Sequence, residues 1–343
     1  MTGKRTGRDA RATLRDVGRE AGVDPSLVSR VINDDPKAYA TTETRKRILA
    51  AIRLLDYKPN ASARGLKLAR TSTIGVLLPD LTNPMNEAII KGIQEKALEL
   101  GYGVVIGNHA EIGVDKAFAS LLLQGQADGL ITLGHEMTDN TLRLISESND
   151  GRILPVNGRI PGISSSVNLN DARGSEIAVE HLAKLGHKRI IGIFAPLRFD
   201  TAKRRQEGFK NACRKFGIEP IAVEAEGYTY QDGFNSAIEG IADFKPTAIY
   251  ASSLVIAIGT LKALKTKKIR VPEDVSVVAL HDAEIANFTS PPLTTVCLPA
   301  SQMGSDAVVR LVDLISGGKP MHYVIDKKPL LIKRESTAAP AKN

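Results

Sequence analysis

The sequence predicts two unlike parts: a small all-α domain that contains a helix-turn-helix, and a larger α/β core of two lobes with parallel sheets. The first 72 residues hold 16 Lys and Arg against 8 Asp and Glu, whereas the rest hold 30 of each kind, so the net charge of +8 lies in the first fifth. After residue 72, short runs rich in Val and Ile, such as KRIIGIFA and VSVVAL, alternate with amphipathic stretches, which is typical of parallel strands and covering helices. More than six such runs in about 270 residues favour two lobes over one.

The composition and the absent motifs exclude several classes of protein. No apolar run approaches the ~20 residues that cross a bilayer, so we expect no membrane role. The chain has only two cysteines and no charged-then-apolar leader, which favours a cytoplasmic protein. Signatures of dinucleotide, nucleotide, zinc-protease, hydrolase and redox sites are missing, and six scattered histidines make no metal set, so we expect no enzyme, cofactor or metal.

The basic excess begins in a polar tail at residues 1–12, which contains MTGKRTGRDAR. The tail lacks hydrophobic residues, so we expect it to stay disordered until it binds a partner. A polyanion is the natural partner of a small basic module, because neutralising phosphates releases counterions. A solvated tail without a partner is the alternative.

Two short helices joined by an Ala-Gly-Val turn are expected after this tail. Thr13 is a good N-cap with Asp16 three residues on, Gly22 ends the first helix, and Pro25 fits the first turn of the second. The apolar positions of the second helix, on one face, are Leu27, Val28, Val31 and Ile32. The polar positions on or near the other face are Ser26, Ser29, Arg30 and Asn33. A helix-turn-helix would aim these polar side chains at DNA, although a two-helix corner of any core could imitate the spacing.

A third helix is predicted over residues 41–55, with an apolar stripe that completes a three-helix domain. The next segment, YKPNASARGLK, is too short and too rich in glycine and proline to be helical alone. We therefore expect it to gain order from a partner, unless it is a plain flexible linker.

Longer stretches carry a resemblance to a known family. The segments that carry the resemblance are TLRDVGREAGVDPSLVSRVIN, TRKRILAAIRLLDYKPNASARGLK, STIGVLLPDLTNP, PPLTTV and IKREST. The chain resembles the lactose-repressor (LacI/GalR) family of bacterial transcription regulators over nearly its whole length. The resemblance implies a helix-turn-helix DNA-binding domain at 13–58, a hinge helix at 59–71, a periplasmic-binding-protein-like effector-binding and dimerisation core at 72–336, and a C-terminal tail at 337–343. It also implies a homodimeric repressor on pseudo-palindromic operator DNA, under allosteric control by a small-molecule effector, a sugar or sugar derivative.

Carried over residue by residue, the resemblance also implies contacts to DNA. Base contacts fall on Pro25, Ser26 and Arg30, and phosphate contacts on Thr13, Ser29 and Asn33. Tyr57, just before the hinge, is a further implied DNA contact, and the implied minor-groove residues of the hinge are Asn60, Ala63, Arg64 and the wedge Leu66.

The implied effector site departs from the family pattern in several places. The matching residues are Met85, Asn86, Thr201, Arg205, Ser253 and His281, with Tyr228 or Tyr230 as an aromatic floor. Met85 and Asn86 replace aromatic side chains, and His281 stands where an aspartate is common. A neutral sugar is therefore a less secure ligand, and a small organic acid paired with Arg205 and a protonated His281 is an alternative. A purely structural role for His281 stays open, as does a cytosolic solute-binding protein with a non-specific basic anchor.

Overall fold

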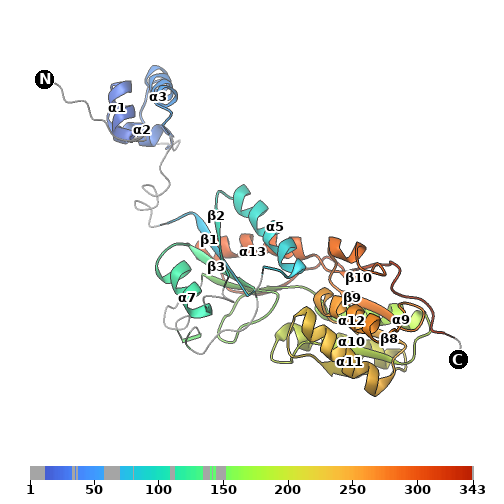
Figure 1. Cartoon of the computed structure of the whole chain (residues 1–343). Helices are drawn as coiled ribbons and strands as arrows, with labels where there is room; N and C mark the ends of the chain where they lie inside the picture. The colour runs from blue at the N-terminus through green and yellow to red at the C-terminus, as the bar shows by residue number, and fades with distance from the viewer. Residues whose placement is uncertain are drawn as a thin grey trace. The chain divides into compact units, whose positions relative to one another are not determined.

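Residues 12–32, 35, 38–57, 70–79, 81–108, 113–133, 140, 142–143 and 152–341 are described by the computed structural model. The chain divides into two units between Thr71 and Ser72, and each is treated by itself (Figure 1). The predicted tail and hinge segment lie almost entirely outside the described residues.

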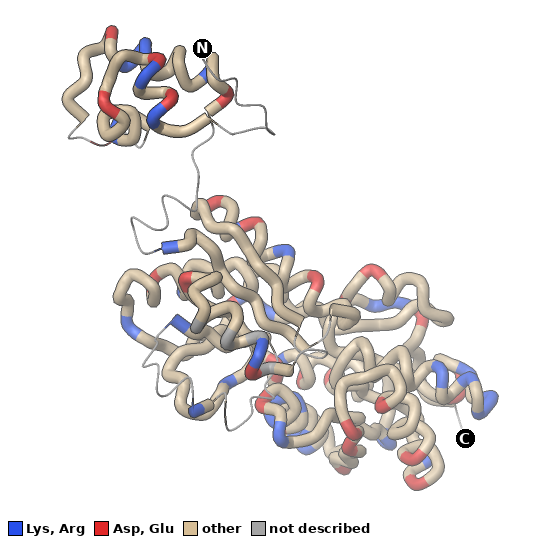
Figure 2. Tube along the Cα trace, turned by 60° about the vertical axis from the view of Figure 1, so that its left-hand side comes forward, with Lys and Arg blue, Asp and Glu red and all other residues tan. Residues whose placement is uncertain are grey.

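The first unit contains the three helices that the sequence predicts. They are α1 (Leu14–Ala21), α2 (Pro25–Ile32) and α3 (Thr42–Leu54). A capping box begins α1, because Thr13 Oγ1 accepts from the backbone N–H of Asp16 at 3.3 Å and the Asp16 carboxylate accepts from that of Thr13 at 3.0 Å. Gly22 ends α1 with a left-handed φ of 64°, which glycine adopts at no steric cost. The described basic residues lie on all three helices (Figure 2).

The first lobe of the second unit is built on a parallel sheet of order β11-β5-β4-β3-β1-β2. Its strands are β1 (Thr73–Leu78), β2 (Gly103–Asn108), β3 (Gly129–Leu133), β4 (Ile153–Val156), β5 (Ser166–Asn168) and β11 (His322–Val324). Its helices are α5 (Pro84–Glu99), α7 (Val114–Phe118), the π-helical turn η1 (Ala119–Leu123) and α13 (Ala300–Ile315).

The second lobe repeats this plan with a sheet of order β12-β10-β9-β8-β6-β7, in which only the β10–β12 pair is antiparallel. Its strands are β6 (Ile190–Phe194), β7 (Ile221–Glu224), β8 (Ala248–Ala251), β9 (Ser276–Leu280), β10 (Thr294–Cys297) and β12 (Leu330–Ile332). Its helices are α9 (Asp171–Lys184), α10 (Asp200–Lys215), α11 (Tyr230–Phe244), α12 (Leu254–Thr266) and the 3-10 turn η2 (Glu284–Asn287).

The chain passes between the lobes three times: from β5 into α9, from β10 into α13, and from β11 into β12. The first crossing places Asp171, the first residue of α9, three residues after the end of a strand of the other lobe. Parallel strands whose carboxyl ends face the space between two lobes favour a ligand site there. None of the helices in the described part of the chain is long and apolar enough to span a membrane.

Candidate functional site

The predicted base-reading residues lie at the start and on one face of α2. Pro25 occupies the first position of the helix, and Asp24 Oδ1 accepts a hydrogen bond from the backbone N–H of Ser26 at 2.8 Å. Ser26 and Arg30 are both exposed, and their spacing of four residues puts them on the same side of the helix. The opposite side buries Val28 and Val31 in the domain core. This polar face is therefore available to a partner.

The other predicted DNA contacts fall into three groups. Thr13 is exposed at its cap, and Ser29 is half-buried. Tyr57 is only 9% exposed and packs in the core of the first unit, so its ring contributes to folding. Asn33, Asn60, Ala63, Arg64 and Leu66 lie outside the described residues.

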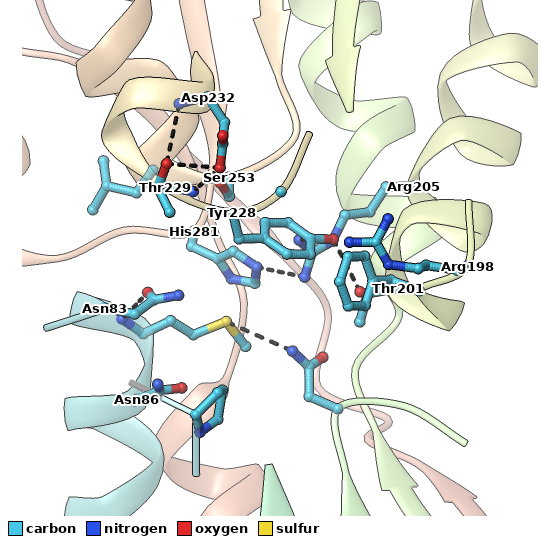
Figure 3. A pocket seen from close by; sticks show the side chains of 16 residues that line it. Asn83, Asn86, Arg198, Thr201, Arg205, Tyr228, Thr229, Asp232, Ser253 and His281 are labelled. Carbon is cyan, nitrogen blue, oxygen red and sulfur yellow. Dashed lines mark hydrogen bonds between the residues drawn. The ribbon is translucent and has the colours of Figure 1, made fainter. Parts of the chain in front are cut away.

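A cavity of about 330 Å³ opens between the two lobes of the second unit (Figure 3). The first lobe lines it with Pro79, Asn83, Met85, Asn86 and Asn157. The second lobe lines it with Arg198, Phe199, Thr201, Arg205, Gly227, Tyr228, Thr229, Asp232, Ser253, Leu254 and His281. All seven effector residues that the sequence analysis singled out, with Tyr228 as the aromatic one, therefore surround one cavity.

Arg205 lies on the floor of this cavity and is 3% exposed. Its Nε donates to Asp171 Oδ1 at 2.8 Å, and its Nη1 donates to the carbonyl oxygen of Ser252 at 3.0 Å. Its Nη2 lies 2.8 Å from Nε2 of His281. The side chain is thus held by α9, by the end of β8 and by the end of β9.

Asp171 is the residue of this cluster that sequence reasoning missed. It is fully buried, and it also accepts a hydrogen bond from Arg204 Nη2 at 2.7 Å. Although burial opposes its ionisation, the guanidinium groups of Arg205 and Arg204 hold the pKa of Asp171 below its ordinary value. The positive charge of Arg205 is therefore balanced within the protein.

Close packing of α9 on α10 makes this ion pair possible. A Cβ at Gly208 would lie 2.1 Å from the carbonyl oxygen of Ala172, so only glycine permits this separation of the two helices. Gly208 is one helical turn beyond Arg205, and Ala172 directly follows Asp171. The sequence offered no signal for this contact beyond a glycine within a helix.

His281 directly follows β9 and is 4% exposed, with a left-handed φ of 70°. Burial, together with the positive charge of Arg205, lowers the pKa of His281 to about 3. This lowered pKa disfavours the sequence-based alternative in which a protonated His281 pairs with an acidic ligand. The ring is uncharged and accepts a hydrogen bond from Arg205 instead.

An aromatic wall stands beside the floor. The rings of Phe199 and Tyr228 have centroids 5.4 Å apart, and Tyr228 Oη lies 3.0 Å from Thr201 Oγ1. Tyr230, the other candidate for this position, lies outside the lining and begins α11. Phe199 was not predicted from the sequence, because the family pattern implied aromatic residues at other positions.

The first lobe contributes amides and a thioether. Asn83 caps α5, its Oδ1 accepting from the backbone N–H of Met85 at 3.1 Å. Asn157 follows β4, and its Nδ2 donates to Met85 Sδ at 3.8 Å. Neither asparagine was singled out from the sequence.

Comparisons with known proteins found matches in both units of the chain. Residues 13–60 match the family described as bacterial regulatory proteins, lacI family, and residues 179–337 match a periplasmic binding protein-like domain. The ribose operon repressor of Escherichia coli K12 is 31% identical over 331 residues, which cover 95% of this chain and 99% of the relative. The chain belongs to the LacI family. It is a DNA-binding transcriptional regulator with an effector-binding core that controls its affinity for DNA.

Further relatives of this LacI-family protein include another repressor and two solved complexes. The transcriptional repressor PurR of Erwinia tasmaniensis is 32% identical over 95% of this chain and 97% of the relative. The lac repressor dimer bound to operator and an anti-inducer superposes with a TM-score of 0.81, at 27% identity, over 96% of this chain and all of that one. A LacI-family regulator of Enterococcus faecium with bound ribose superposes with a TM-score of 0.67, at 25% identity, over 78% of this chain and 99% of that one.

Proposed function

We propose that this LacI-family regulator is a homodimeric repressor that reads a pseudo-palindromic operator with α2 and responds to a small polar effector in the interlobe cavity. The cavity is the observation that carries the effector half of the proposal. It gathers seven residues, separated by up to nearly 200 positions in the sequence, around a volume of about 330 Å³. Cavities of a few hundred Å³ with a few convergent polar groups are typical small-molecule sites.

The DNA half rests on the exposed polar face of α2. Ser26 and Arg30 project from the helix that a helix-turn-helix places in the major groove. A C2 dimer presents two such helices, so its operator should be a pseudo-palindrome. The lac repressor relative was solved as a dimer on its operator, which supports the same assembly here.

Selection from a randomised duplex pool tests the DNA half. The purified protein should enrich one palindromic sequence and bind it at least a hundredfold more tightly than a scrambled duplex in the same salt. A solute-binding protein with a non-specific basic anchor would give salt-sensitive binding without any preferred sequence. That outcome would overturn the repressor proposal.

The effector is proposed to be a sugar or a sugar derivative without net charge. Amides and hydroxyls of the cavity can bind polar groups, while Met85, Phe199 and Leu254 offer an apolar surface for the face of a ring. The Enterococcus faecium relative holds ribose, which supports this class. An organic acid is less favoured, because the charge of Arg205 is already balanced by Asp171.

A thermal-shift screen of sugars and sugar acids tests the effector half. Any ligand that raises the melting temperature should also change the affinity for the selected operator, because the two equilibria are linked. A ligand that stabilises the protein without any effect on operator binding would separate the cavity from regulation.

A further inference from the structure

We infer that Arg205 holds His281 as a fixed hydrogen-bond donor toward the cavity, so that the effector presents an uncharged acceptor oxygen of the carbonyl class to Nδ1 of His281. This inference rests on the proposed function, since it names the ligand class of the same cavity. It is carried by three observations: the direction of one hydrogen bond, the position of the second ring nitrogen, and the charge balance of the floor.

The direction of the hydrogen bond between Arg205 and His281 follows from chemistry. A guanidinium group has five N–H donors and no acceptor, so Nη2 of Arg205 donates across the 2.8 Å to Nε2 of His281. Nε2 must then carry a lone pair. A neutral imidazole has one N–H, which is therefore on Nδ1. The tautomer of His281 is set by its neighbour.

The neighbour is itself fixed. Arg205 donates through Nε to Asp171 and through Nη1 to the carbonyl oxygen of Ser252, so its guanidinium plane cannot turn away from His281. The backbone N–H of His281 donates to the carbonyl oxygen of Val296 at 2.9 Å, and this hydrogen bond fixes the backbone from which the imidazole side chain extends. Both ends of the Arg205–His281 hydrogen bond are thus anchored.

His281 lines the cavity, and its second ring nitrogen lies away from Arg205. Nδ1 makes no hydrogen bond to any residue in the described part of the chain, and it is not among the enclosed polar atoms that lack a partner. Figure 3 shows one ring nitrogen on the dashed line to Arg205 and the other turned away from it. A ligand in the cavity therefore meets an N–H donor at His281.

The carboxylates around the cavity are already engaged. Asp232 Oδ2 accepts from both the backbone N–H and the hydroxyl of Thr229, at 2.8 and 2.7 Å. Asp171 accepts from Arg204 and Arg205 behind the lining. Near His281, both oxygens of Asp171 and Oδ2 of Asp232 therefore accept from protein groups and not from the ligand.

The charges beneath His281 cancel. Asp171 balances Arg205, and Arg204 also pairs with Asp200, so the cluster holds two cations and two carboxylates. A carboxylate ligand that accepts from His281 would lose its hydration without meeting an uncompensated cation in this cluster. Arg198, which also lines the cavity, is exposed, so that water screens its charge. An uncharged carbonyl oxygen, as in a lactone, accepts from Nδ1–H at a much smaller cost of desolvation. A lactone of a sugar is the simplest such ligand.

The tautomer can be tested without any ligand or DNA. In full-length protein with ¹⁵N-labelled histidine, the His281 signals are identified by their loss in His281→Asn. We expect the protonated nitrogen to be Nδ1 and the ring to show no titration between pH 8 and pH 5. A proton on Nε2, or a titration near pH 6, would overturn the inference while leaving the repressor proposal untouched.

The ligand class is tested with matched compounds on pentose and hexose skeletons: the lactone, the aldose, the aldonate and the alditol. Binding is measured by thermal shift and calorimetry. The wild type should bind the lactone at least tenfold more tightly than the alditol of the same skeleton. His281→Asp replaces the donor by an acceptor at a φ that aspartate tolerates, and should remove this preference.

His322→Asp is the matched control, because His322 pairs with Ser166 outside the cavity lining, and it should leave the preference intact. Three outcomes would each overturn the inferred ligand class. An alditol or aldonate could bind most strongly, or the preference for the lactone over the alditol could be unchanged in His281→Asp. The third is that no lactone or aldose binds at all. The operator selection judges the repressor proposal separately.

Discussion

Asp171 and Arg205 form a buried ion pair between α9 and α10, with Arg205 Nε 2.8 Å from Asp171 Oδ1. Asp171 directly follows the first crossing between the lobes, and Arg205 lies on the floor of the cavity. The pair therefore joins the ligand site to the segment in which the chain first crosses from one lobe to the other.

Asp171→Asn should destabilise the protein strongly, because it leaves the buried Arg205 without a carboxylate. A broken buried pair of this kind costs about 3–5 kcal/mol in the free energy of unfolding. Asp200→Asn is the matched control, since Asp200 pairs with the partly exposed Arg204, and it should cost less than about 1 kcal/mol. Urea denaturation of both variants measures the difference, and equal losses would contradict the role assigned to Asp171.

Arg205→Ala should abolish the response to the effector while operator affinity stays within a few-fold of wild type. Arg205 lines the cavity in the second unit, and the DNA-reading residues lie in the first. Fluorescence anisotropy on labelled operator, with and without effector, measures both quantities. Arg204→Ala provides the control, because Arg204 contacts the same Asp171 without lining the cavity, and a substantial response should survive. A fully responsive Arg205→Ala protein would place the effector elsewhere.

Arg30→Ala should weaken operator binding by about 1–3 kcal/mol and relax the preference at one base position in each half-site, as expected for lost base readout. The selection experiment repeated with this variant measures the preference. Arg19→Ala changes an exposed arginine of α1 instead and should leave the sequence profile intact. An unchanged profile for Arg30→Ala would exclude Arg30 from base readout.

His181 should make the protein less stable as the pH falls. Its Nε2 lies 2.9 Å from Thr337 Oγ1, and burial, with nearby cationic groups, lowers its pKa from 6.5 to about 4. The His181 side chain takes up a proton at a higher pH in the unfolded chain than in the folded one. The folded state therefore has its full stability above about pH 6.5. As the pH falls from 6.5 to 4, the free energy of unfolding decreases by up to about 1.4 kcal/mol per pH unit. His181→Gln, which keeps a polar side chain, should flatten the dependence of the melting temperature on pH; the same slope in both proteins would refute this.

Long elements with repeated signals could be predicted from the sequence. Thr13 and Gly22 mark the two ends of α1, and the runs KRIIGIFA and VSVVAL became β6 and β9. Short strands such as β5 and β11 were not predicted, because three residues carry no detectable periodicity. These strands form only because a neighbouring strand supplies their hydrogen-bond partners.

The sequence by itself determined that a basic helix-turn-helix precedes a neutral two-lobed α/β core, because charge distribution, caps and hydrophobic periodicity are local properties of the chain. The resemblance of the sequence to the LacI family also singled out Arg205 and His281. Only the tertiary structure decided that these residues, 76 positions apart, share a hydrogen bond, and that Asp171, 34 positions from Arg205, balances its charge. The protonation state of His281 depends on atoms within a few ångströms in space, and so does the charge that a ligand meets. Those neighbouring atoms are brought together where the chain crosses between the lobes and where α9 packs closely on α10.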